Sequence, residues 1–530
     1  MTEANINTNN NESNQSDINT SSLEAATTPN GEEGPAAVQQ NDDDAAAAEK
    51  RRLSTFDAVM HIIKGNLGPG ILNLPYAFAT GGYLYSSILF VIVVFQGLYS
   101  MCLLVYCKYL LQQHFEALRQ EKLDTTPMTI DVVTSSRNSN RSSTDDAAMA
   151  VEEKSDTNVP LISYGDVANA TFGTKGRWVV NFFAFTMQFG VCCAFLGLMS
   201  TNLTAQTGWS MYISEGIITV ALLFLVLVRH LKDIKWFSSF ANILMLIAVG
   251  TAIVAAIIQI VRYDSGNNTV TVDDANNVAA NTQTKQPTMF PDTISAGVQF
   301  ITSIFFAFEG MALVLPIEKA FSMGYKVKAD ENKASKRFGF LTLYSMAFVG
   351  CLFYVTGITN SIAFPDVSSG SITAYLRVTF PKNIWYDIVN IFETVAVFLT
   401  FSLQMTPPNE ILDDMIDGGC GCFKRPSPTS CWGKYNWIAT RYVLVLFCYG
   451  ANMIFGNDLS LLISFFGAAG QTNLAMIPCI IYLKLQHMGI APRNMAVSIL
   501  NGAIIIFCSC AMVAGIAFSV MDVIKAFENP

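Results

Sequence analysis

Residues 56–80 form an apolar segment long enough to cross a bilayer, and a helix-breaking run interrupts its middle. Three glycines and one proline occur within the seven residues of this run, which reads Lys64-Gly65-Asn66-Leu67-Gly68-Pro69-Gly70. A regular helix cannot continue through it, because proline removes a backbone donor and glycine disfavours helix. Unwound backbone at membrane depth is tolerated only where it faces protein or a water-filled cavity. A simple proline kink is the alternative, but the density of breakers favours a binding site in a discontinuous helix.

The composition is that of a membrane protein. Hydrophobic residues make up 51% of the chain and charged residues only 14%, against about 25% charged residues in a soluble domain. The formal net charge of -9 comes from acidic residues in the termini and loops, and no basic patch indicates nucleic acid. The polar, Asn-rich start has no charged-then-apolar leader, so we expect no cleaved signal peptide.

The apolar segments predict an all-α integral membrane protein with eleven transmembrane helices. The expected spans are 56–80, 83–111, 177–204, 211–228, 236–261, 293–318, 338–361, 384–410, 436–455, 459–484 and 495–519. They make a transmembrane domain over residues 54–520, interrupted by a long, partly disordered cytosolic loop at 112–176. Residues 1–53 are too polar to bury a core, so a disordered tail is expected there, and 521–530 form a short C-terminal tail.

Basic residues indicate the orientation of these spans. Lys and Arg concentrate in the loops that share a side with the N-terminus, and the short loop with Arg229, Lys232 and Lys235 shows this bias clearly. By the positive-inside rule, the N-terminus is predicted to be cytosolic and the C-terminus non-cytosolic.

A second broken segment occurs in the sixth span, where Glu309-Gly310 follows Ser303–Phe308 and Pro316 comes soon after. Spans one and six are corresponding positions of two five-helix halves. This spacing fits an inverted repeat, in which the broken helices form a substrate site near the middle of the bilayer. We therefore expect Ser303, Phe305, Phe306 and Phe308 at the same site as the break in span one.

Three ionisable side chains inside spans are candidates for proton coupling or gating. A carboxylate in the middle of a membrane has a high free-energy cost and is usually functional. Glu309 and Glu393 are both predicted to lie there. His61 precedes the first break by one helical turn, and histidine titrates near neutral pH. Each also has a structural alternative: a protonated carboxyl bonded to the break for Glu309, a polar pairing for Glu393, and a neutral imidazole bonded to a carbonyl for His61.

Other motifs add little chemistry. Cys420, Cys422 and Cys431 share a cytosolic loop but lack a fourth ligand, which favours reduced or lipid-modified thiols over zinc. Asn267 begins an Asn-Asn-Thr triplet in a non-cytosolic loop, so glycosylation is expected there. No nucleophile triad, phosphate loop or metal cluster is present in the sequence, which argues against an enzyme.

The ordered motifs resemble the proton-coupled amino acid transporters of the amino acid/auxin permease group. The matching segments are His61–Pro75, Ser163–Val167, Phe306–Gly310 with Val314–Glu318, Ser402–Gln404 with Pro408–Ile411, and Leu462–Ala468. The sequence departs from the family at Pro69, where threonine is frequent, and at Glu393, where animal members usually carry an uncharged residue. Vacuolar exporters of fungi and plants share the same signatures.

The resemblance implies the fold of the bacterial leucine transporter, with ten core helices in an inverted repeat plus one. It also implies small neutral amino acids as substrates and H⁺ as the coupling ion. The substrate carboxylate would meet N–H groups near Gly65–Gly70, and its ammonium would meet carbonyls around Ser303–Phe308. The expected partners are the amino acid and the lipid bilayer, in a vacuolar, lysosomal or plasma membrane. The alternative is a non-transporting amino acid sensor that signals from such a membrane.

Overall fold

The computed structural model describes residues 54–125, 163–227, 231–264, 286–322, 328–368, 370–417, 431–455 and 458–528, and their regular structure is entirely helical. The expected N-terminal tail, residues 126–162 of the long loop and Asn267 lie outside the described residues.

The described residues form the following helices. In chain order they are α2 (Thr55–Lys64), α3 (Gly70–Gly81), α4 (Tyr83–Thr125), α6 (Tyr164–Phe172), α7 (Thr174–Thr207), α8 (Met211–Leu225), α9 (Leu231–Asp264), α10 (Ile294–Ala307), the 3₁₀ helix η1 (Glu309–Leu313), α11 (Val314–Ser322), α12 (Lys328–Ala363), α13 (Ile372–Thr379), α14 (Ile384–Gln404), α15 (Thr406–Asp417), α16 (Cys431–Ile454), α17 (Leu459–Phe466), the π-helical turn η2 (Gly467–Gln471), α18 (Thr472–His487) and α19 (Met495–Glu528).

Each expected span falls on a helix or on a group of helices. Within the described residues, eight helical segments are long and apolar enough to cross a membrane, and two shorter apolar helices accompany them. The first expected span is the pair α2 and α3, and the sixth is the group α10, η1 and α11. Both interruptions fall at the predicted breaks. The count of eleven crossings itself stays a prediction.

Several helices extend beyond the apolar segments that predict them. Helix α4 continues to Thr125, α6 forms just before α7, and α19 runs to Glu528. Local signals fix some helix starts. Ser54 and Asp57 form a reciprocal capping box at the start of α2, and Ser163 and Asp166 do the same for α6.

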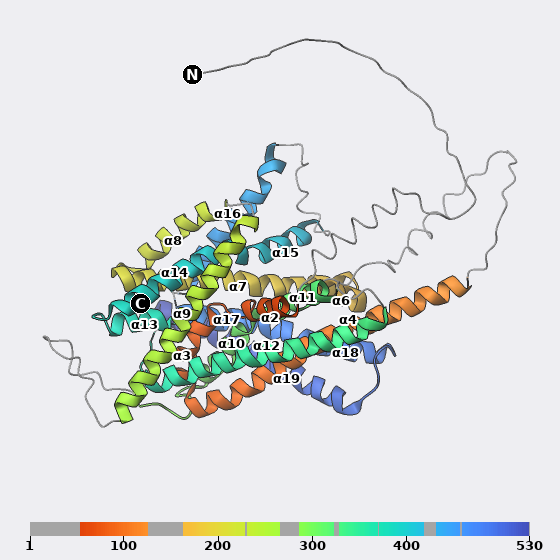
Figure 1. The fold of residues 1–530 in the computed structure, drawn as a ribbon, viewed down its shortest axis with the longest axis horizontal. Helices are drawn as coiled ribbons and strands as arrows, with labels where there is room; N and C mark the ends of the chain where they lie inside the picture. The colour runs from red at the N-terminus through yellow and green to blue at the C-terminus, as the bar shows by residue number, and fades with distance from the viewer. Residues whose placement is uncertain are drawn as a thin grey trace, which may run out of the picture. The chain divides into compact units, whose positions relative to one another are not determined.

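The helix bundle has two ends, named here by the elements found there. The α2 end holds the start of α2, and the α13 end holds α13 and the last turns of α19. Figure 1 shows α13 and the C-terminus at the left, with α6 and the far part of α4 at the right.

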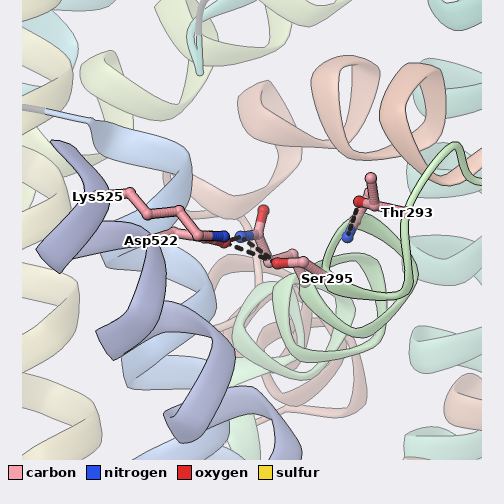
Figure 2. Close-up of polar contacts among 6 residues, drawn as sticks. Thr293, Ser295, Asp522 and Lys525 are labelled. Atoms are coloured by element: carbon pink, nitrogen blue, oxygen red, sulfur yellow. Dashed lines mark hydrogen bonds and ion pairs between the residues drawn. The ribbon is translucent and has the colours of Figure 1, made fainter. Parts of the chain in front are cut away.

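Helix α10 is fixed to its neighbours at the α13 end. The Asp522 carboxylate of α19 accepts hydrogen bonds from Ser295 Oγ and Gln299 Nε2, both at 2.7 Å, and from Lys525 Nζ at 3.0 Å (Figure 2). Thr293 caps the start of α10 through the N–H of Ala296. The half of helix six before its break is thereby anchored to α19.

Aromatic packing joins α3 to α10 and α12. Phe78 of α3 meets Phe300 of α10 edge to face, with ring centroids 5.0 Å apart. Phe78 also contacts Phe90 of α4 and Tyr354 of α12. Such pairs add about 0.5–1.5 kcal/mol each beyond area burial. The halves of helices one and six that lie toward the α13 end therefore pack as one block.

Candidate functional site

The breaks in helices one and six lie against each other. A Cβ atom built on Gly68 would lie 2.6 Å from Oε1 of Glu309, and one built on Gly70 would lie 2.7 Å from Cα of Ala307. Only glycine permits such close approach. The two unwound segments, distant in sequence, therefore form a single site.

Asn66 connects the two breaks directly. Its side chain is 1% exposed. Its Nδ2 donates to the carbonyl of Ile62 at 2.8 Å, and its Oδ1 accepts from the N–H of Gly310 at 3.2 Å. The amide thus satisfies one backbone group in each broken helix, as buried polar groups at a helix interruption require.

A cavity of about 270 Å³ lies beside this junction, in the half of the bundle toward the α2 end. Its wall combines both breaks with α7, α9 and α14. The lining residues are His61, Gly65, Leu67, Gln188, Phe195, Ala241, Asn242, Met245, Glu309, Leu313, Pro316, Ile317, Ala396, Thr400, Gln404 and Pro407. The wall is apolar with few polar groups, the pattern of a small-molecule site.

Two predicted ionisable residues line this cavity at different depths. Glu309 begins η1, is 6% exposed, and its Oε2 has no hydrogen-bond partner among the described residues. His61 is exposed. The cavity therefore extends from a buried carboxyl at the helix-six break to an accessible imidazole on α2.

The predicted substrate residues fall into two groups. Gly65 and Leu67 line the cavity, while Asn66, Gly68 and Gly70 are buried in the junction behind it. The helix-six residues do not line the cavity and are buried instead. These are Ser303, Phe305, Phe306 and Phe308. Phe308 packs on Phe353 of α12. The assignment of both groups of residues as substrate contacts stays a prediction.

Glu393 does not line the cavity with Glu309 and His61. It is fully buried on α14 and accepts a hydrogen bond from Thr373 of α13. If Glu393 takes part in proton coupling, it does so at a site separate from the cavity.

Three glutamines that surround the site were not predicted as site residues, although Gln404 lies in a segment that resembles the family. Gln188 of α7 and Gln404 of α14 line the cavity, and Gln404 Nε2 donates to Gln188 Oε1 at 3.1 Å. Gln471, in the π-helical turn η2, donates from Nε2 to the Phe308 carbonyl at 2.5 Å. Polar side chains inside apolar spans were the signal that could have identified them, and π-helical turns are frequent at functional sites.

The ends of the broken helices carry partial charges that suit the two ends of a small zwitterion. The N-terminus of α3 has a partial positive charge, which suits a carboxylate, although its first residues are buried behind the cavity. Glu309 and the carbonyls at the end of α10 suit an ammonium group. Within the described part of the chain, no group of three or more His, Cys, Asp or Glu residues could hold a metal ion.

Two discontinuous helices that meet beside a cavity are typical of membrane transporters. A family model described as "Transmembrane amino acid transporter protein" matches residues 51–122 and 148–521. The chain belongs to this family, and it is an integral, multi-pass membrane protein, as the resemblance implied.

Curated relatives agree with this assignment. The chain is 27% identical to "Amino acid transporter ANT1" of Arabidopsis thaliana, over 69% of this chain and 68% of the relative. It is 24% identical to "Amino acid transporter AVT3C" of the same plant, over 69% and 71%. It is 23% identical to "Vacuolar amino acid transporter 3" of Saccharomyces cerevisiae, over 82% of this chain and 51% of the relative.

Two solved structures are similar at low sequence identity. The structure titled "Inward facing conformation of Mhp1" gives a TM-score of 0.49 at 12% identity and covers 89% of this chain and 90% of its own. The structure of the manganese transporter of Eremococcus coleocola gives 0.42 at 11%, covering 88% and 94%.

Proposed function

We propose that the protein is a secondary active transporter that moves neutral amino acids together with protons by alternating access. The observation that carries this proposal is the junction of the two broken helices, with Gly68 against Glu309, at the wall of the cavity. Substrate bound in the cavity would place its carboxylate toward the start of α3 and its ammonium toward Glu309.

The cavity lining supports a neutral substrate side chain. The described residues that line it include no lysine or arginine to pair with an acidic side chain. Phe195, Met245 and Leu313 supply apolar surface. An anionic side chain would be desolvated there without a lysine or arginine as a permanent counter-ion, which is unfavourable.

Glu309 and His61 are the proposed proton carriers. Both line the cavity, one at the substrate junction and one exposed. Glu309 can exchange a proton with the cavity, while His61 can exchange one with the aqueous side that the cavity faces. Protonation of Glu309 would remove a buried negative charge, so the proton and the substrate affect each other's binding at the same place.

The proposed location is a vacuolar-type membrane, with the N-terminus in the cytosol. The yeast relative carries "vacuolar" in its name. Lys and Arg in the segments predicted to share a side with the N-terminus support the orientation.

Uptake into proteoliposomes tests the proposal. Purified full-length protein, given a pH gradient and no voltage, should concentrate labelled neutral amino acids against their gradient and leave acidic ones outside. Glu309→Gln should abolish gradient-driven accumulation, and His61→Ala should reduce it while some exchange of substrate persists. Substrate binding without accumulation would instead indicate a sensor and contradict transport. If His61→Ala concentrates substrate as well as the unchanged protein does, the proton does not pass through His61.

A further inference from the structure

A second polar cluster is buried at the α13 end, apart from the cavity. Its five side chains, each at most 2% exposed, are Asn202 of α7, Ser371 and Thr373 at the start of α13, and Asn390 and Glu393 of α14. Ser371 Oγ donates to Asn202 Oδ1 at 2.7 Å and lies 3.1 Å from Thr373 Oγ1. Thr373 donates to Glu393, and Asn390 Nδ2 donates to the Asn202 carbonyl at 2.9 Å. Three helices are thus joined by one chain of hydrogen bonds.

The hydrogen bonding of this cluster is incomplete. The Asn202 side chain interacts with the Glu393 carboxyl, but Asn390 Oδ1 is buried and has no partner among the described residues. Buried polar atoms in folded proteins are rarely left unpaired, so Asn390 Oδ1 indicates that the cluster lacks one hydrogen-bond donor.

Within the described part of the chain, no hydrogen bond or ion pair joins a cation to Glu393. The ionisable groups at this end of the packed elements include Tyr76 of α3, Glu215 of α8, Arg262 of α9, Tyr375 and Arg377 of α13, and Tyr386 and Asp387 of α14. Arg377 pairs with Asp387, and Tyr375 donates to Asp366 at 2.7 Å. Among the described residues, no hydrogen bond or ion pair joins any of these groups to Glu393. A carboxylate there would be a buried charge without a counter-ion.

We propose that this cluster is a proton-binding site, separate from the substrate cavity, and that its protonated form holds α13 against the bundle. A proton on Glu393 removes the buried charge and adds an O–H donor to a cluster in which Asn390 Oδ1 lacks one. Loss of that proton leaves an uncompensated carboxylate, which water can solvate only if α13 moves away.

The segment that leads into α13 is packed closely against other helices at this end of the bundle. A Cβ atom built on Gly370, which precedes α13, would lie 2.8 Å from Ser460 Oγ and 3.0 Å from Leu459 Cβ. Ser460 Oγ in turn donates to Asn73 Oδ1 of α3 at 2.7 Å. The segment leading into α13 therefore lies against α17 and the second half of helix one. A proton on Glu393 would close the α13 end while the cavity is accessible from the α2 end. This inference rests on the proposed proton-coupled transport.

Thiol labelling in proteoliposomes tests the proposal. The reporter is Leu459→Cys, since Leu459 is 4% exposed beneath the start of α13. It is placed in a full-length background whose native cysteines are replaced and which still transports. The matched control is Val378→Cys on α13, where the side chain is 63% exposed. Dividing one rate by the other removes the direct effect of pH on thiol reactivity.

The normalised labelling rate at Leu459→Cys should rise about tenfold between pH ~5 and pH ~8 at the α13 side. Glu393→Gln, which is neutral at every pH, should keep the rate low throughout. Thr373→Val removes the donor to the carboxyl but leaves the carboxyl itself, so it should raise the rate while the dependence on pH remains.

Three results would overturn the proposal. They are an unchanged pH dependence in Glu393→Gln, a loss of pH dependence in Thr373→Val, and a fall in the rate when sodium is added at constant pH, which would assign the cluster to sodium. Uptake measured in the same vesicles separates the two proposals. If uptake is driven by protons but the labelling rate does not depend on pH, only the proposed site at Glu393 is contradicted. If the labelling rate depends on pH but uptake is not driven by protons, only proton-coupled transport is contradicted.

Discussion

Gly68 and Gly70 lie two residues apart, yet they lack side chains for different reasons. The atom nearest to a Cβ on Gly68 is a carboxylate oxygen at the tip of Glu309, which can rotate away. The atom nearest to a Cβ on Gly70 is Cα of Ala307, which belongs to the backbone of α10. A methyl group at position 68 therefore disturbs the site, whereas one at position 70 disturbs the packing of two helices.

This difference predicts opposite outcomes for two alanine variants. Gly70→Ala should destabilise the protein by about 1–3 kcal/mol, the usual cost of overpacking, and lower its melting temperature in detergent. Gly68→Ala should melt normally but reduce uptake about tenfold, equivalent to about 1.4 kcal/mol, because it displaces the Glu309 carboxyl. The control is Gly250→Ala, where nothing lies within 4 Å of the added Cβ. Normal uptake by Gly68→Ala would show that the position of Glu309 is irrelevant.

Residue chemistry predicted the breaks but not which side chains face the cavity. Glycine and proline in the Gly65–Gly70 segment act locally, so the sequence shows where helix one ends. The orientation of Phe305 or Phe306 depends on which helices pack around α10, and no local pattern encodes this. Gln188 and Gln404 meet only because α7 and α14 pack together.

At the scale of elements, a buried ion pair fixes the second half of helix six. Lys108 of α4 bonds to Glu318 of α11, and Tyr109 donates to the same carboxylate. The side chains of the pair are only 4% and 1% exposed. Because α11 carries the cavity wall at Pro316 and Ile317, this pair positions that wall against α4.

Removing one partner of this pair should be worse than removing both. Lys108→Met leaves Glu318 buried without a cation and should destabilise the protein by about 3–5 kcal/mol. Lys108→Met combined with Glu318→Met removes both charges and should regain most of that loss. Thermal melting of the two variants in detergent measures the difference. If the double variant is no more stable than the single one, charge imbalance is not the cause.

Element boundaries were predicted less well than element existence. The apolar run that predicts the second span ends at residue 111, but α4 continues to Thr125 through good helix formers such as Gln112, Leu118 and Glu121. Hydropathy indicates where the bilayer core ends, whereas residues with high helix propensity can continue the helix beyond that point. The ten-residue helix α2, by contrast, ends at Lys64 where the breakers begin.

At the scale of the whole molecule, the two ends of the bundle differ. Toward the α2 end, the cavity reaches the exposed His61. Toward the α13 end, Asn73, Ser460 and Gly370 are packed against one another. A transporter that binds substrate from one side at a time needs this asymmetry, and alternating access would require the reverse arrangement as well. Sequence reasoning placed the site between the two broken helices, but which end is open depends on the packing of α13.

The orientation of these ends in the membrane is the last prediction. The α2 end should face the cytosol, because the basic residues concentrate in the sequence segments predicted to share a side with the start of α2. Asn267 lies in the chain between the end of α9 and the start of α10, in a segment predicted to be non-cytosolic, so it should be glycosylated in cells. The measurement is a glycosidase-sensitive mass shift that Asn267→Gln abolishes.

A tag placed after Pro530 provides the independent check on that orientation. Helix α19 begins at the α2 end and runs to the α13 end, so the tag should be protected from protease added to the cytosolic face of sealed membranes. A tag after Pro530 that is digested from the cytosolic face, together with an Asn267 that is never glycosylated, would reverse the orientation. The cavity that ends at His61 would then face the lumen, and acidic pH there would act on His61 directly rather than on Glu393.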